Sequence, residues 1–224
     1  MKLPINETAA NSHGPLAIVN ALKLDNVSIE NAYGKTRTPE FLAMNPCHCA
    51  PCLQFDDGSA MWESNAIMRY LVVNFDKEHK FYPEDAMLRG RIDMCMDWRQ
   101  SSLYPCLPDI GYVIFGMDCS DEGAIKSFNK LMNEHFKTLT DVFLKDHDYC
   151  YSDTPTIADL SIAPCLTFIK ARSKFWENVP GKVKEYYERV LAAFPETKEN
   201  FDMLDGMASG YDGKGKDLEP VFDA

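Results

Sequence analysis

The pattern of apolar residues changes character once along the chain, near residue 80, and this change limits the folds that are open to it. Before that point, short strand-like runs alternate with helical periods in the order β-α-β-α-β-β-α. A polar stretch at 76–86, which contains Pro83, separates this region from one whose periods are helical to about residue 204. We therefore predict an α/β domain at residues 1–78, an all-α domain at residues 88–204 and a loose tail at residues 205–224.

Local signals predict where several elements start and turn. Thr38 followed by Pro39 is typical of a helix start, because threonine caps free N–H groups and proline suits the first turn. Thr156 with Asp159 has the form of a capping box, with a structural role. The triplet Asp56-Asp57-Gly58 between two apolar runs predicts a hairpin turn. The segments expected as strands are 2–5, 27–32, 52–55 and 59–62, and the other segments expected as helices are 14–24, 63–75, 87–103, 122–144, 158–171 and 182–194.

Net charge argues against some classes of partner. Lysine and arginine number 23 against 34 aspartates and glutamates, a formal net charge of −11. Phosphate-rich partners need neutralising cations, so nucleic acid and anionic membrane surfaces are poor candidates. No run of about 18 apolar residues is present to span a bilayer. The first residues lack the apolar stretch of a secretory signal, so we expect a cytoplasmic protein whose eight cysteines are reduced thiols.

Several motifs, in a common order and spacing, carry a resemblance to a known family. Residues 39–53 read PEFLAMNPCHCAPCL and residues 62–71 read WESNAIMRYL. They resemble the PEFL…NPxHxVPxL and WESRAIxxYL segments of the cytosolic glutathione transferases, and residues 81–83, 103–105 and 156–160 match further family positions. These motifs are most similar to those of the delta, epsilon and theta-type classes, which use a serine at the thiol. The resemblance implies a thioredoxin-like N-terminal domain that binds glutathione, followed by an all-helical domain.

The chain departs from the family pattern at three positions. Ala50 stands where valine or isoleucine is usual, Asn65 replaces an arginine, and Leu16 replaces the arginine that usually follows the catalytic serine. These departures leave two alternatives open beside a transferase. One is a non-catalytic binding or assembly module of the same fold, and the other is a glutathione-dependent peroxidase or isomerase that uses the same site.

The resemblance also implies which residues hold glutathione. A cis bond before Pro51 would turn the N–H and C=O of Ala50 outward to pair with the cysteinyl unit. Ser64 would hold the γ-glutamyl carboxylate at a helix N-terminus, and Glu63 would attract the ammonium group. The simpler interpretation of Ser64 is an N-cap. The set expected to bind glutathione is His48, Ala50, Pro51, Glu63, Ser64 and Asn65, with His48 at the glycine carboxylate.

Ser12 is the candidate for activating the thiol of glutathione. The family places this group between the first strand and the first helix, where Ser12 lies. A hydroxyl there can donate a hydrogen bond to the sulfur and so favour the thiolate, which is the species that attacks. A helix N-cap is the structural alternative for Ser12. Asn11 is the rival donor, since related fungal-type proteins use asparagine.

A cluster of cysteines around His48 invites two other hypotheses, a redox pair and a zinc site. The reactive CxxC pair of thioredoxin-like domains follows the first strand, whereas Cys49 and Cys52 flank Pro51. Neighbouring residues on an extended chain point to opposite faces, so Cys47 and His48 would not converge on one ion. We therefore expect small buried thiols at these positions and no metal.

The second substrate and a second subunit follow from the same resemblance. We expect a glutathione transferase that conjugates glutathione to hydrophobic electrophiles, a detoxification type of reaction. The family implies a homodimer whose two-fold interface uses the helix at 87–103 and the last helix of the first domain. The aromatic residues expected to line the pocket for the electrophile are Tyr104, Tyr112, Phe115 and Phe175.

Overall fold

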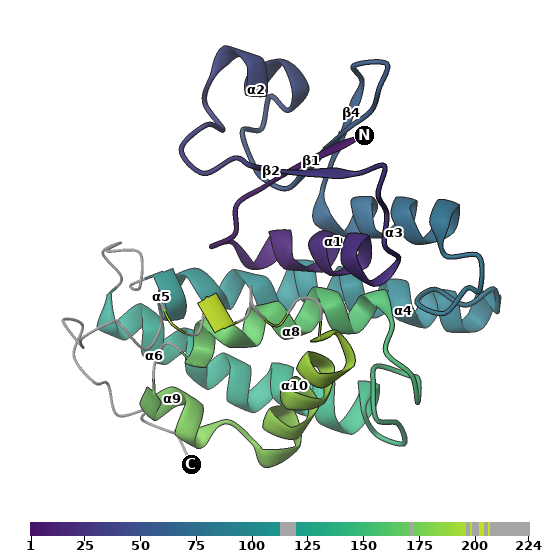
Figure 1. Ribbon diagram of the computed structural model, residues 1–224. Helices are drawn as coiled ribbons and strands as arrows, with labels where there is room; N and C mark the ends of the chain where they lie inside the picture. Colours follow the sequence, from purple (N-terminus) through teal and green to yellow (C-terminus); the bar gives the residue numbers. More distant parts are fainter. Residues whose placement is uncertain (113–119, 171–172, 196–197, 199–201, 204–205, 207–224) are drawn as a thin grey trace.

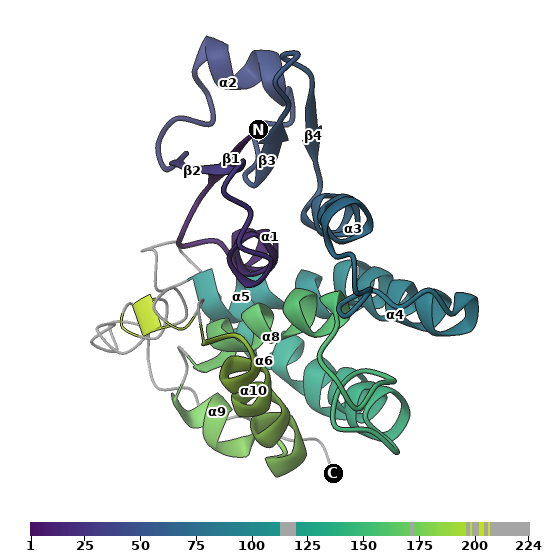
Figure 2. The same ribbon diagram turned by 45° about the vertical axis from the view of Figure 1, so that its right-hand side comes forward.

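The computed structural model describes residues 1–112, 120–170, 173–195, 198, 202–203 and 206. A small sheet stands at one end of the molecule, with α2 (Pro39–Met44) on one side and α1 (Ala10–Ala21) and α3 (Ser64–Phe75) on the other (Figures 1 and 2). A layer of helices built around α8 (Ile157–Lys170) lies beneath, and both α1 and α3 contact α8.

The sheet is mixed and has the strand order β2-β1-β3-β4. β1 pairs in parallel with β2 and antiparallel with β3, and β3 pairs antiparallel with β4. The expected order of strands and helices in the first domain is confirmed, and so is a helical domain after it. The strands are β1 (Lys2–Ile5), β2 (Ser28–Asn31), β3 (Cys52–Gln54) and β4 (Ala60–Trp62).

Three local predictions are confirmed by hydrogen bonds and backbone angles. The Thr38 side chain accepts a hydrogen bond from the N–H of Phe41 and so caps α2. Gly58, in the turn between β3 and β4, has a φ of +87°, a conformation that residues with a side chain rarely adopt. At α8 the N–H of Thr156 donates to the Asp159 carboxylate (2.7 Å), as a capping box requires.

Helix α1 begins four residues before the predicted start at Gly14. The side chain of Asn6 accepts from the N–H of Thr8 (3.1 Å), and the C=O of Asn6 accepts from the N–H of Ala9 (2.9 Å). This turn starts the helix early, and Pro15 then lies inside it. A Cβ at Gly14 would lie 2.6 Å from the sulfur of Met68. The missing side chain therefore lets α1 pack directly against α3.

The helical domain contains shorter pieces than the sequence predicts. The helix expected at 87–103 is α4 followed by a π-helical turn, and the one expected at 122–144 is interrupted by two such turns. No helix within the described residues is long and apolar enough to cross a bilayer. The predicted tail lies outside the described residues, apart from Gly206. The helices are α4 (Ala86–Trp98), α5 (Leu107–Gly111), α6 (Asp121–Lys130), α7 (Phe136–Thr138), α9 (Ser173–Asn178) and α10 (Gly181–Ala193), with π-helical turns at Arg99–Leu103, Leu131–His135 and Leu139–Phe143.

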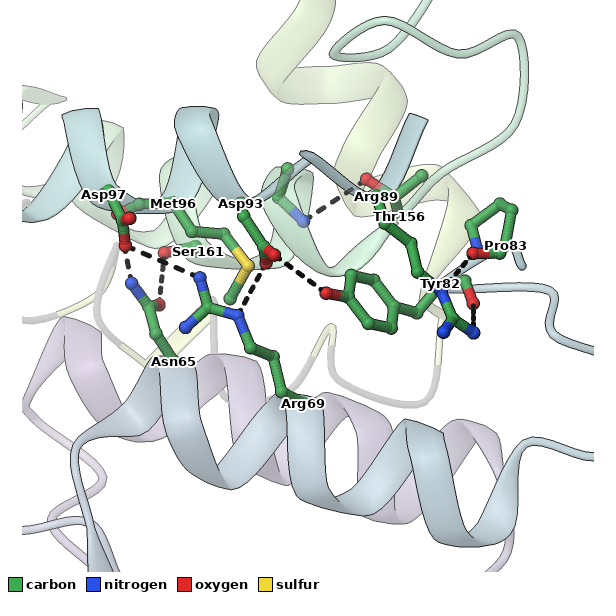
Figure 3. Close-up of polar contacts among 11 residues, drawn as sticks. Asn65, Arg69, Tyr82, Pro83, Arg89, Asp93, Met96, Asp97, Thr156 and Ser161 are labelled. Carbon is green, nitrogen blue, oxygen red and sulfur yellow. Dashed lines mark hydrogen bonds and ion pairs between the residues drawn. The ribbon is translucent and has the colours of Figure 1, made fainter. Parts of the chain in front are cut away.

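An ion pair joins the two domains at the contact between α3 and α4 (Figure 3). The Arg69 guanidinium lies 2.6 Å from one oxygen of Asp93 and 3.5 Å from Asp97. The Tyr82 hydroxyl donates to the other oxygen of Asp93 (2.9 Å). Both oxygens of Asp93 are therefore engaged, which holds α3 in register against α4.

Candidate active site

A cavity of about 280 Å³ lies between the two domains, at the start of α1. The first domain lines it with the turn before α1 and with Tyr33, which follows β2. The helical domain contributes three aromatic rings. The described residues that line it are Asn6, Thr8, Ala9, Ala10 and Tyr33 on one wall and Tyr104, Tyr112 and Phe168 on the other.

Ser12 lies directly behind this wall, in the first turn of α1. Its side chain is only 1% exposed, and its Oγ accepts a hydrogen bond from the N–H of Asn6 (3.0 Å). Within the described part of the chain, the Ser12 hydroxyl proton has no acceptor. Thr8 lines the cavity itself, but its hydroxyl donates to the Asn6 side chain (2.8 Å). Of the Ser12 and Thr8 hydroxyls, Ser12 is therefore the one whose proton can be donated to a ligand.

Asn11, the rival donor, is held between the two domains. Its Oδ1 accepts from the Arg99 guanidinium (2.6 Å), and its Nδ2 donates to the Tyr104 hydroxyl (3.2 Å). An arginine can only donate, so this contact fixes which end of the amide is oxygen. The Asn11 amide thus points at Tyr104.

The loop before β3 presents backbone groups to solvent. The buried Asn45 side chain accepts from the N–H of Cys47 (2.9 Å) and donates to the C=O of Cys49 (2.8 Å), and so shapes the loop. The expected cis bond between Ala50 and Pro51 is present. Neither the N–H nor the C=O of Ala50 makes a hydrogen bond within the described residues.

Helix α3 begins at Ser64 with its N-terminus uncapped. The residue before it, Glu63, has a φ of +73° and makes no side-chain capping bond. Ser64 is the first helical residue, so the N-cap interpretation of this serine is wrong. The first N–H groups of α3 lack partners within the helix and carry its positive dipole end. A strained residue beside free N–H groups is typical of a ligand site.

The side chain of Asn65 turns away from this N-terminus (Figure 3). It is buried, its Nδ2 donates to the C=O of Met96 (3.0 Å), and its Oδ1 accepts from the Ser161 hydroxyl (2.8 Å). Both ends of the amide are therefore used in the contact with α4 and α8. What Asn65 offers to a ligand at the start of α3 is its backbone N–H.

The four aromatic candidates have different locations. Tyr104 and Tyr112 both line the cavity, and their hydroxyls lie 3.1 Å apart. Phe175 is fully buried and stacks on Phe128, with ring centroids 4.3 Å apart, so it belongs to the helical core and not to the cavity wall. Phe115 lies outside the described residues.

The cysteine loop differs in part from the expectation of buried thiols. Cys52 is buried, and burial raises the pKa of its thiol to about 11. Cys47 and Cys49 are exposed instead, because the Asn45 side chain holds the loop backbone and leaves these side chains outside. Partial loss of solvent around the sulfur, together with the nearby Cys47 and Glu63, raises the pKa of Cys49, which keeps this thiol protonated near neutral pH. Within the described ranges, no three His, Cys, Asp or Glu side chains lie close enough to share a metal ion.

Two family descriptions cover the two domains. "Glutathione S-transferase, N-terminal domain" matches residues 10–72, and "Glutathione S-transferase, C-terminal domain" matches residues 122–189, together more than half of the chain. The chain belongs to the glutathione S-transferase family. As a glutathione transferase, it uses glutathione as a substrate.

Solved structures share this architecture over nearly the whole chain. A delta-class glutathione transferase from Nilaparvata lugens is 25% identical, with a TM-score of 0.77 over 94% of this chain and 99% of that one. An epsilon-class glutathione S-transferase from the housefly, Musca domestica, is 26% identical, with a TM-score of 0.75 over 94% and 98%. A human glutathione S-transferase in its apo form, 18% identical, has a TM-score of 0.80 over 93% and 90% and shows the shared fold alone.

Most residues of the cavity were missed from the sequence, and so was Arg99, which lies behind Tyr104. The lining residues that were missed are Asn6, Thr8, Ala9, Ala10, Tyr33 and Phe168. For Arg99 a signal was available, because it continues a helical series of buried apolar residues. The members of that series are Ile92, Cys95, Met96 and Leu103. A charge at a core position of a helix is a reason to look for buried partners.

Proposed function

We propose that this transferase joins the thiolate of reduced glutathione to hydrophobic electrophiles, a detoxification type of reaction, in the cytoplasm. The cavity between the two domains is the observation that carries the proposal. One wall is the start of α1, beside Ser12, and the other is formed by aromatic rings of the helical domain. A thiolate and an apolar electrophile held side by side react as one bound pair, which removes the entropic cost of their encounter.

The first domain binds glutathione through groups that have no hydrogen-bond partner within the described residues. The uncapped start of α3, with the Ser64 hydroxyl, binds the γ-glutamyl carboxylate, because free N–H groups and a helix dipole favour an anion. Glu63, which is exposed at the same point, attracts the ammonium group. The peptide groups of Ala50 pair with the cysteinyl unit, and His48 reaches the glycine carboxylate.

Ser12 activates the sulfur. Its hydroxyl already accepts from Asn6, so its own proton is available to the thiolate. A hydrogen bond to a charged acceptor contributes about 1.5–3 kcal/mol, which corresponds to roughly a 10- to 150-fold larger thiolate fraction. The thiolate forms the bond to the electrophilic carbon, and the bonding pair displaced there leaves with a departing group or collects on a neighbouring atom.

Each chain has one domain at residues 1–78 and a second at residues 88–204. Two chains form a homodimer through α3 and α4. Support comes from three exposed apolar side chains on these helices: Val73 is 55% exposed, Met87 is 68% and Met94 is 44%. Apolar side chains exposed together on neighbouring helices are typical of a contact surface. Light scattering at micromolar protein should give twice the mass of one chain, and the mass of a single chain would refute the dimer.

Calorimetry with reduced glutathione tests the binding site. The variant Ser64→Ala should bind glutathione about 10-fold more weakly, since it loses a hydrogen bond to a carboxylate. The matched control is Ser28→Ala, which removes a hydroxyl from an exposed position on β2 and should bind like the wild type. Equal affinity in both variants would contradict the role of Ser64.

Turnover then separates the transferase from its alternatives. The wild type should conjugate a chlorodinitrobenzene, with release of chloride. Glutathione binding without any turnover would favour a binding or assembly module. Reduction of an organic hydroperoxide without conjugation would favour a peroxidase that uses the same site.

A further inference from the structure

Two exposed thiols, Cys47 and Cys49, lie in the loop before β3 and have no part in the function proposed above. Only His48 separates them, and the residue that follows them is Ala50. His48 and Ala50 both belong to the set proposed to bind glutathione. A chemical change at the two thiols therefore acts directly on a stretch of chain that glutathione is proposed to contact.

The backbone between the two cysteines turns back on itself. His48 has a φ of +49°, and its N–H donates to the C=O of Asn45 (3.0 Å). The Cys49 thiol donates to the C=O of Cys47 (3.0 Å), which places its sulfur against the backbone of the other cysteine. The Cys47 sulfur in turn contributes to the raised pKa of Cys49, as expected for two sulfurs that lie near each other.

The two thiols differ in what their surroundings allow them to do. The Cys49 proton is donated to the Cys47 C=O, and partial loss of solvent raises the pKa of Cys49, so this thiol attacks poorly near neutral pH. Within the described residues, the exposed Cys47 thiol makes no hydrogen bond. The two cysteines therefore suit the two steps of a disulfide exchange, in which Cys47 attacks from solvent and Cys49 resolves the product.

Charged side chains from two other segments lie near Cys49. Arg37, between β2 and α2, and Glu63, before α3, act on the pKa of Cys49 in opposite directions. Three segments that come together only in the folded chain therefore meet at this thiol. Glutathione and its disulfide are peptides with a net negative charge. The exposed Arg37 favours their approach, although the chain as a whole is acidic.

We propose that Cys47 and Cys49 form a thiol–disulfide exchange site for glutathione disulfide, with Cys47 as the attacking thiol, and that the closed Cys47–Cys49 disulfide weakens glutathione binding. The second part rests on the function proposed above, and the first part does not. A disulfide across His48 fixes that residue. It also pulls on the C=O of Cys49, which the Asn45 side chain holds (2.8 Å) next to Ala50.

The exchange is balanced without a further reactant. The Cys47 thiolate attacks one sulfur of glutathione disulfide and forms a mixed disulfide, and the first glutathione leaves as a thiolate. The Cys49 thiol loses its proton and attacks the Cys47 sulfur, which closes the Cys47–Cys49 bond and releases the second glutathione. The two glutathione thiolates take up the protons that the cysteines lose. A disulfide that is exposed and closes so short a ring is reopened by excess reduced glutathione.

Mass mapping after treatment with glutathione disulfide tests the exchange. Trypsin releases residues 38–69 as one peptide, which holds Cys47, Cys49 and the buried Cys52. After an acid quench, unfolding and alkylation with N-ethylmaleimide, the wild-type peptide should be alkylated at Cys52 alone and should lack the hydrogens of the other two thiols. Reduced glutathione should restore alkylation of Cys47 and Cys49. A peptide that stays fully alkylated, or that carries glutathionyl groups without closing, would overturn the inference.

Single variants test the roles of the two thiols. Cys49→Ser lacks the resolving thiol, so Cys47 should keep a glutathionyl group as a mixed disulfide. Cys47→Ser should acquire this group about 10-fold more slowly, because the thiolate is the attacking species. Equal rates in the two variants would contradict the assignment of Cys47 as the attacking thiol. The control Cys106→Ser removes a buried thiol of the helical domain and should close the pair like the wild type.

Calorimetry with S-methylglutathione tests the effect on binding, since this analogue has no free thiol and cannot reopen the disulfide. The oxidised wild type should bind it about 10-fold more weakly than the reduced wild type. The double variant Cys47→Ser/Cys49→Ser should bind it equally after both treatments. Equal affinity of the oxidised and reduced wild type would overturn the second part of the inference. A reduced wild type that does not bind the analogue would contradict the proposed glutathione site, while the peptide map still decides the exchange.

Discussion

At the start of helix α8, one carboxylate accepts hydrogen bonds from the surrounding donors. At the start of helix α3, no side chain of the described residues caps the N–H groups. The Asp159 carboxylate at α8 accepts from the Thr156 N–H (2.7 Å), the Thr156 hydroxyl (3.1 Å), the Cys150 N–H (2.9 Å) and the Tyr186 hydroxyl (2.9 Å). At α3, Glu63 has a φ of +73° and caps nothing.

The same attraction between a helix N-terminus and an anion serves stability at one helix start and binding at the other. In both, N–H groups and a positive dipole end favour an anion. At α8 the anion belongs to the chain and is fully buried, so the interaction stabilises the fold. At α3 no side chain of the described residues caps the helix, and we propose that the open position takes the carboxylate of glutathione. We infer that stability and binding should respond to different substitutions at these two places.

The largest effect is expected for Asp159→Ala. It leaves four donors without their acceptor in the core, so the free energy of unfolding should fall by about 3–5 kcal/mol. Urea unfolding measures the loss, with Asp153→Ala as the control, since Asp153 is exposed and pairs with His147 at the surface. If the chain does not fold after this change, Asp159→Asn provides a milder test. A change in Asp159→Ala no larger than that of the control would contradict the folding role of this carboxylate.

Acid should also lower the stability of the fold, through His13 in α1. Burial lowers the pKa of His13, next to Ser12, from 6.5 to about 4. The pKa of His13 is lower in the folded chain than in the unfolded chain. Between pH 6.5 and 4 the unfolded chain therefore protonates His13 while the folded chain does not, so stability falls as pH falls. The loss by pH 4.5 should be about 2–3 kcal/mol. Urea unfolding at pH 7.5 and 4.5 measures it.

The variant His13→Gln is the control for this pH dependence. Glutamine does not titrate, so the variant should lose about 2–3 kcal/mol less than the wild type between the two pH values. Parallel losses in the two proteins would assign the acid sensitivity to other groups.

The smallest change in stability is expected at α3. Glu63→Gly removes the side chain that disfavours a positive φ and should raise the free energy of unfolding by about 0.5–1 kcal/mol. Glu63→Ala keeps the Cβ and should leave stability unchanged. Both variants lose the carboxylate, so both should bind glutathione more weakly by calorimetry. A Glu63→Gly variant that loses stability would show that this helix start is needed for folding.

The features that sequence predicts well depend on neighbours in the chain. The Thr38 cap, the hairpin glycine at 58 and the Asp159 box each act over three or four residues, so their patterns are readable from the sequence. The early start of α1 was missed because it depends on Asn6, a residue that fits a strand end as well as a turn. The residues proposed to bind glutathione came from the family motifs, because local patterns alone do not assign them.

The features that sequence does not predict depend on contacts between the domains. Asn11 meets Arg99 across 88 residues, and Asn65 meets Ser161 across 96. Nothing near these residues in the chain reveals that their amides are engaged. For the same reason, Phe175 resembles a pocket residue in the sequence and is a core residue in the fold.

We expect glutathione bound along the first domain to place its sulfur at Ser12 as a thiolate. Ultraviolet titration of the glutathione complex measures that thiolate directly. The wild-type complex should contain the thiolate near neutral pH, and Ser12→Ala should raise the pKa of the bound thiol by about one to two pH units. Thr8→Val should leave that pKa unchanged, because the Thr8 hydroxyl donates to Asn6. A Ser12→Ala complex that titrates like the wild type would contradict the claim.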